Sequence, residues 1–164
     1  MPARFVPREF VVPRLLETER FRVRTLTIHD VVKDYDAVMT SRAHLRAALP
    51  WGWPPDDLTL EQDLIDLAWH QKEFDRATSF AFAVMSPDER RLLGCVYVDP
   101  AEKDGYDAEV AMWVRADELA TGLEDVLEAT VRRWVAEAWP FARVGYPGRD
   151  MAWEAWDALP ERTS

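Results

Sequence analysis

Three apolar segments and a long amphipathic segment follow one another in the second half of the chain, and their order constrains the fold most. The apolar segments are Phe80–Met85, Leu92–Val98 and Ala108–Arg115. They are bounded by turn residues and polar loops, a pattern that predicts β-strands. From about Thr121 to Ala138, apolar residues recur at steps of three and four, which predicts a helix that packs one face on a sheet. The sequence therefore predicts an α+β fold.

The first half of the chain predicts one strand and several helices. Arg20–Leu26 alternates charged and apolar residues, as a half-buried strand does. Helices are expected over residues 31–39 and 42–49, and a third helix begins at Thr59, which has Gln62 in capping-box position. Residues 1–15 contain three prolines without clear periodicity, so we expect a pendant N-terminal extension before a single domain over residues 16–164.

Composition and charge exclude several classes of function. The 164 residues carry a formal net charge of −10, and residues 51–164 hold 24 acidic against 11 basic side chains. Nucleic-acid binding needs a basic surface, so this class is not expected, whereas a cationic amine substrate is compatible with the charge. No segment resembles a signal peptide or a membrane span. The lone Cys95 is expected to be a buried thiol, and one cysteine favours a reducing, cytoplasmic location.

Four stretches together resemble the GCN5-related N-acetyltransferases (GNATs), and most closely the branch that acetylates the N-termini of ribosomal proteins. In chain order, the stretches are Leu16–Arg24 with Thr27–Asp30, His44–Arg46 leading into Leu49–Trp51, Leu92–Val96, and Ala108–Arg115. The resemblance implies a mixed, mostly antiparallel sheet flanked by helices and split like a V. It also implies transfer of an acetyl group from acetyl-CoA to a small-molecule or peptide amine.

The resemblance places the cofactor along the last of these strands. The pantetheine arm of acetyl-CoA would hydrogen-bond the backbone at Met112, Trp113 and Val114. The pyrophosphate would bind the N-terminus of the following helix, where exposed amides and glycines favour anions. Only Arg115 and Gly122 match the family's pattern of one basic residue and two small ones there.

The junction between this strand and the helix departs from the family in its charge. Asp117, Glu118, Glu124 and Asp125 put four carboxylates where two phosphates would bind. Each close pair of like charges is repulsive, by about 1 kcal/mol even in water. Thr121 and Glu124 also have the spacing of a capping box, which would satisfy the free amides of the helix. The sequence therefore argues against family-typical pyrophosphate binding.

The C-terminal part also departs from the family. Family members usually continue with a helix that bears a catalytic tyrosine and with a last strand. After the final strand expected within Phe141–Tyr146, this chain offers only a short helix over Met151–Leu159, entered from Asp150. Tyr146 is the only late tyrosine and does not match in position. We therefore expect the sheet to be truncated at this end, or completed by a second copy in a homodimer.

Glu109 is the candidate base for deprotonating an acceptor amine, since it lies on the strand that would border the cleft. Alternation with Ala108 and Val110 allows instead an outward-facing position on that strand. Trp51 and Trp53 could line an acceptor pocket and stack on a cation, or could close the open end of the core.

The remaining motifs support no other chemistry. The three histidines lack metal-ligand spacing, and no nucleophile elbow, Cys-x-x-Cys pair or phosphate-binding loop occurs. Two hypotheses remain. The chain is an N-acetyltransferase that uses acetyl-CoA or another acyl-CoA, or it is the same fold kept as a non-catalytic domain for binding or assembly.

Overall fold

A computed structural model describes residues 3–163, so Met1, Pro2 and Ser164 lie outside the described residues. Six strands form one sheet in the order in which they occur in the chain, and only the last pair, β5 and β6, is parallel. The strands are β1 (Leu15–Glu17), β2 (Arg22–Thr25), β3 (Phe80–Met85), β4 (Leu92–Pro100), β5 (Ala108–Val114) and β6 (Val144–Gly145). This mixed, mostly antiparallel sheet confirms the predicted α+β class.

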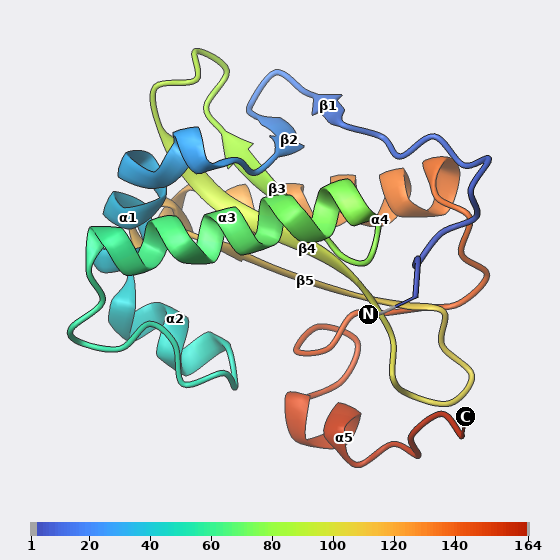
Figure 1. Cartoon of the computed structure of the whole chain (residues 1–164). Helices are drawn as coiled ribbons and strands as arrows, with labels where there is room; N and C mark the ends of the chain where they lie inside the picture. Colours follow the sequence, from blue (N-terminus) through green and yellow to red (C-terminus); the bar gives the residue numbers. More distant parts are fainter. Residues whose placement is uncertain (1–2, 164) are drawn as a thin grey trace.

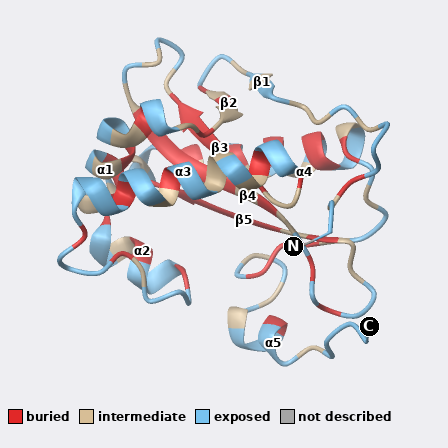
Figure 2. Cartoon of the chain, viewed as in Figure 1, coloured by how far each residue is buried: buried red, intermediate tan, exposed pale blue. Residues whose placement is uncertain are grey.

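Helices cover both faces of the sheet (Figure 1). The helices are α1 (Val31–Met39), α2 (Arg42–Ala48), α3 (Leu60–Arg76), α4 (Leu123–Ala138) and α5 (Trp153–Asp157), with short 3-10 helices η1 (Ile28–Asp30) and η2 (Ala116–Thr121). Helices α1 and α2 and most of α3 pack on one face and α4 packs on the other, while Phe74 near the end of α3 joins the α4 layer. Figure 2 shows that burial is concentrated in β3, β4 and β5, which these layers enclose.

Alternation along the strands divides the core into two layers. On β5, Met112 and Val114 join the α4 layer, whereas Trp113 joins the layer of α1 to α3. Since side chains alternate along a strand, Glu109 points to the same face as Trp113. The α1–α3 layer also contains the thiol of Cys95, which is fully buried as expected.

The predicted strands and the long helix are observed, with three local differences. Residues 3–14 are not pendant, because Val6 is buried and Phe5 and Phe10 pack against the α4 layer. The last helix, α5, begins at Trp153 rather than after Asp150, because residues 146–150 form a turn. Strand β4 continues to Pro100, so Asp99 lies within the sheet and not in the expected polar loop.

Candidate functional site

Strands β5 and β6 are paired at only two positions and then separate. Ala108 pairs with Val144 and Glu109 with Gly145, after which the chain beyond β6 turns away. A notch of about 180 Å³ lies between α2, the end of β5 and the residues that follow β6. Met112 and Trp113, two of the predicted cofactor contacts, line this notch.

The Arg149 side chain occupies the edge of β5 in this notch. Its Nη2 donates to the Met112 carbonyl oxygen at 3.2 Å. The same guanidinium forms ion pairs with Glu124 at 3.1 Å and Glu128 at 2.7 Å, both on α4. A pantetheine arm could therefore bind the Met112 carbonyl only if Arg149 moved. The hydrogen-bonding position that the resemblance assigns to the cofactor at Met112 is therefore already occupied.

The junction between β5 and α4 is a 3-10 helix in place of a glycine-rich turn. Gly122, at φ 75°, is the N-cap of α4 and carries no side chain that could cap it. The capping box predicted for Thr121 and Glu124 is wrong, because Thr121 lies one residue before the cap. Its hydroxyl donates to the Glu118 carbonyl oxygen at 2.7 Å and accepts from the Leu123 N–H at 3.3 Å.

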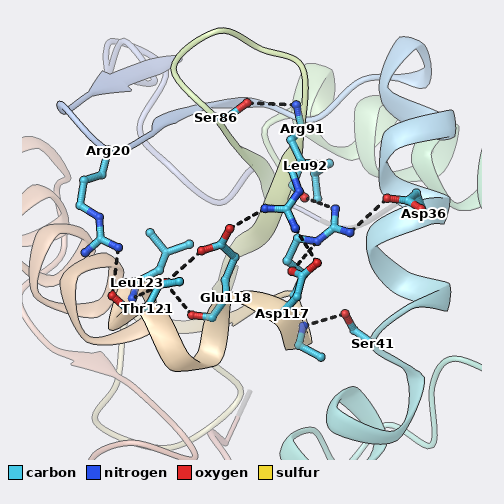
Figure 3. A network of polar contacts seen from close by, with 12 residues as sticks. Arg20, Asp36, Ser41, Ser86, Arg91, Leu92, Asp117, Glu118, Thr121 and Leu123 are labelled. Carbon is cyan, nitrogen blue, oxygen red and sulfur yellow. Dashed lines mark hydrogen bonds and ion pairs between the residues drawn. The ribbon is translucent and has the colours of Figure 1, made fainter.

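Two arginines pair with Asp117 and Glu118, two of the four acidic side chains of this junction (Figure 3). Arg91 forms ion pairs with both Asp117 and Glu118. Arg115 is buried, pairs with Asp117 at 2.9 Å and with Asp36 of α1 at 3.1 Å, and donates to the Leu92 carbonyl oxygen. Partial burial alone would raise the pKa of Asp117, but the hydrogen bonds and charges of these two arginines lower it.

The basic side chains of the junction are already paired with carboxylates and do not fit a pyrophosphate. The Ala116 N–H donates to the Ser41 hydroxyl at 2.8 Å, and the Leu123 N–H already has its partner. Arg115, predicted as a cofactor contact, is engaged by carboxylates and is buried rather than a surface residue. Of the amides in the first turn of α4, the described residues give a side-chain partner to the Leu123 N–H alone, so the ion pairs and the acidic side chains, more than capped amides, oppose an anion here.

A cavity of about 840 Å³ opens on the α1–α3 side of the point where β5 and β6 separate. Glu109 and its cross-strand neighbour Asp99 lie on its floor. The Trp156 indole N–H donates to Glu109 Oε2 at 3.1 Å. Gly145 makes room for this ring, because a Cβ there would come within 2.3 Å of it. The Glu109 carboxylate thus faces a cavity and not open solvent.

Burial shifts the two carboxyl groups toward the neutral form. Burial first, and then the charge of Asp99, raises the pKa of Glu109. Burial raises the pKa of Asp99 to about 6, although a hydrogen bond from the Ser79 hydroxyl opposes this shift. A carboxylate with a raised pKa is better matched to accept a proton near neutral pH.

The cavity is acidic and has aromatic walls. Its acidic side chains are Glu73, Asp99, Glu102, Glu109, Asp157 and Glu161. Among residues 3–163, no lysine or arginine forms an ion pair with any of these six, and the one lysine of the lining, Lys103, donates to two backbone carbonyls. Trp51 packs edge-on against Tyr97 and Trp153 at the cavity wall. This arrangement suits a cation.

The predicted residues separate into three groups. Glu109 and Trp51 meet in the 840 Å³ cavity, while Trp53 lines a neighbouring hollow with Trp51. Met112 and Trp113 lie at the notch, and Gly122 lies at the junction beyond it. Trp153 lines both the notch and the cavity and so lies between the two.

Sequence reasoning did not single out Asp99, Arg149, Trp153 or Trp156. The spacing of polar residues gave no sign of Arg149, whose partners Glu124 and Glu128 lie more than twenty residues away. An alternating continuation of β4 through Tyr97 and Asp99 could have placed Asp99 beside Glu109.

Within the described chain, no three metal-binding side chains gather into a group. Over the same residues, no helix is both long and apolar enough to cross a membrane.

No family model matches the sequence, and no curated protein matches it either. Solved structures do match. The chain has the fold of the GCN5-related N-acetyltransferases. A protein of Vibrio cholerae assigned as a ribosomal-protein-serine acetyltransferase has a TM-score of 0.66 and 14% identity, over 80% of this chain and 72% of that one.

Two further GNAT structures support the same fold. The ribosomal-protein-S5-alanine acetyltransferase of Vibrio fischeri has a TM-score of 0.64 and 20% identity, over 80% of this chain and 72% of its own. RimL, a ribosomal L7/L12 α-N-protein acetyltransferase solved with coenzyme A, has a TM-score of 0.59 and 13% identity. The match covers 74% of this chain and 68% of the RimL chain. These likenesses bear out the resemblance seen in the sequence, and at this identity they concern the fold.

Proposed function

We propose that this protein is an N-acyltransferase that moves an acetyl group from acetyl-CoA to a small-molecule or peptide amine. The observation that carries the proposal is the position of Glu109, in an acidic and aromatic cavity at the point where β5 and β6 separate. The structural neighbours are acetyltransferases, which supports the same reaction class. The proposal includes a cytoplasmic setting, because the lone thiol of Cys95 is buried and unpaired.

The acceptor amine would bind on the α1–α3 side of the sheet. The carboxylates of the cavity attract an ammonium ion, and the indole rings exclude water from it. Glu109, held by the Trp156 N–H, accepts the proton that the amine must lose before it attacks a carbonyl carbon. The raised pKa of Glu109 favours this proton transfer.

The donor would approach from the notch on the other side of the separation. Acetyl-CoA, when bound, supplies the acetyl group as an activated thioester. The extended arm could hydrogen-bond the Met112 carbonyl oxygen once Arg149 releases it, whereas the paired arginines and acids of the junction do not fit its diphosphate. We therefore expect donor binding to be weaker than in a GNAT with a glycine-rich junction.

The test is acetyl transfer by the full-length protein, measured as amine-dependent release of CoA thiol. Glu109→Gln keeps the size and the acceptor atom for Trp156 but removes the base, so we expect the rate to fall at least 100-fold. Asp104→Asn, a neutralisation on an exposed turn outside the cavity, is the matched control and should leave the rate unchanged. Equal rates in the wild type and Glu109→Gln would remove Glu109 from the mechanism.

A second function is favoured by the paired arginines of the junction and by Arg149 at the edge of β5. In this version the fold binds an amine, or a second copy of the chain, without catalysis. It predicts no calorimetric heat with acetyl-CoA up to millimolar concentration. If the non-catalytic domain binds a second copy of the chain, sedimentation should show a homodimer. A monomer in sedimentation would argue against this assembly role.

A further inference from the structure

A second hollow of about 590 Å³ lies beside the cavity. It is enclosed by α1, α3 and the loop before α3 that carries Trp51 and Trp53. Its aromatic lining is formed by Trp51, Trp53, Trp69, His70 and Tyr97. Its acidic lining is formed by Asp34, Asp63, Asp66 and Asp99. No lysine or arginine lines it. The hollow combines an apolar wall with negative charge, and the reaction proposed above does not use this combination.

Asp34 of α1 and Asp63 of α3 form a pair of buried carboxyl groups at this hollow. Only 3% of Asp34 and 1% of Asp63 is exposed. Neither oxygen of Asp63 has a hydrogen-bond donor among the described residues, and neither aspartate has an ion-pair partner there. Burial first, and then the charge of Asp63, raises the pKa of Asp34 well above its usual range, although the Cys95 thiol, which donates to Asp34 Oδ1 at 3.7 Å, opposes this shift.

Protonation of Asp34, which its raised pKa favours, removes one of the two charges but leaves the charge of Asp63. One negative charge then remains in a region of low dielectric without a cation. His70 does not supply that cation, because burial lowers its pKa and favours the neutral ring. A buried and uncompensated carboxylate creates a strong field in the hollow above it, even without direct contact.

The mouth of the hollow exposes apolar side chains. Trp69 is 61% exposed, Ile65 is 53% exposed and Trp51 is 46% exposed, and all three line the hollow. Indole faces attract cations as well as apolar groups. We infer that this hollow binds an organic ammonium ion, with its charge toward the Asp34–Asp63 pair and its apolar body against the tryptophans.

This binding does not require acyl transfer. The hollow and the cavity share Trp51, His70, Tyr97 and Asp99, so a ligand in one touches the wall of the other. If the ligand is also the acceptor substrate, that identification rests on the proposed function. Binding is therefore measured without acyl-CoA, so a failed transfer assay leaves this inference standing.

The test is isothermal titration calorimetry of the full-length protein with n-hexylammonium chloride, and with 1-hexanol as the neutral analogue. We expect hexylammonium to bind at least tenfold more tightly than hexanol. Asp63→Asn should remove this preference, whereas Asp57→Asn, on an exposed loop outside the hollow, should keep it. Equal binding of the two probes to the wild type would overturn the inference, because only apolar contact would then remain.

A second variant keeps the inference testable if Asp63→Asn does not fold. Trp69→Ala changes an exposed residue, and we expect severalfold weaker binding of hexylammonium. Leu119→Ala, a comparably exposed apolar residue on η2, serves as its control. Unchanged binding in Trp69→Ala would overturn the role of the indole wall, and an unchanged preference for hexylammonium in a folded Asp63→Asn would overturn the role of the buried carboxylate.

Discussion

The two sides of the separation between β5 and β6 treat their acidic residues in opposite ways. At the junction before α4, arginines neutralise Asp117, Glu118 and Glu124. On the α1–α3 side, Asp63 and Glu109 face cavities and are paired with no lysine or arginine in the described part of the chain. At the junction, Asp117, Glu118 and Glu124 are paired with arginines of the same protein. On the α1–α3 side, Asp63 and Glu109 remain available to pair with a cationic ligand.

On the proposed function, the α1–α3 side would be the acceptor side of the site and the junction would be its cofactor side. The amine side retains an acidic, aromatic cavity with a candidate base. On the junction side, Arg91 and Arg115 are already paired with carboxylates, which lowers the capacity of the junction for an anion. Each prediction below alters one side and should leave the other unchanged.

The largest expected effect on stability comes from Arg115→Met at the junction. Arg115 is 5% exposed and connects Asp36, Asp117 and the Leu92 carbonyl oxygen. Removal of one partner from a buried network is strongly destabilising, so the free energy of unfolding should fall by about 3 kcal/mol. Urea unfolding measures it, with Arg90→Met on the exposed surface as the control. A change no larger than in that control would show that the network contributes little.

Asp63→Asn on the amine side should have a smaller effect of opposite sign. Burial raises the pKa of Asp63 to about 6, so its ionised form is disfavoured in the folded protein. The folded state binds more protons than the unfolded state between about pH 4 and 6, and stability therefore falls as pH rises through that range. The shift corresponds to about 3 kcal/mol at pH 7. The buried amide of the variant costs part of this gain, so the free energy of unfolding should increase by about 2 kcal/mol.

The pH dependence separates this explanation from a general packing effect. The difference in stability between Asp63→Asn and the wild type should be small near pH 4 and grow up to pH 7. Urea unfolding at several pH values measures it. A difference that is independent of pH, or that shrinks as pH rises, would contradict an uncompensated carboxylate at this position.

The smallest effect on stability is expected from the double change Asp117→Asn with Glu118→Gln. Both carboxylates pair with Arg91 at a partly exposed position, so the loss should be about 1 kcal/mol. The change leaves Arg91 without its two carboxylate partners and Arg115 without Asp117, so both guanidinium groups could bind phosphate. We therefore expect calorimetry to show that acetyl-CoA binds at least tenfold more tightly. Unchanged affinity would show that the acids are not what opposes the pyrophosphate.

The sequence predicted the strands and the covering helix because their signals are local. Apolar periodicity alone identified β3, β4, β5 and α4. It also placed Glu109 on the strand that borders the cavity. The face on which Glu109 lies depended on the pairing of β5 with β4 and β6, which periodicity leaves open.

The rest of the site depends on contacts between distant residues. Arg149 reaches Met112 across 37 positions, and Trp156 reaches Glu109 across 47. The Asp34–Asp63 pair joins two helices whose patterns each appear ordinary. Single residues after β6 have no periodic pattern that could place them, so these contacts required the fold.

Amine-dependent release of CoA thiol from acetyl-CoA, with hexylammonium as acceptor and the full-length protein, tests the central claim most directly. The account predicts release that requires the amine and that Glu109→Gln reduces at least 100-fold. Heat of binding for hexylammonium without any thiol release would contradict acyl transfer. The chain would then be an amine-binding protein with an acetyltransferase fold.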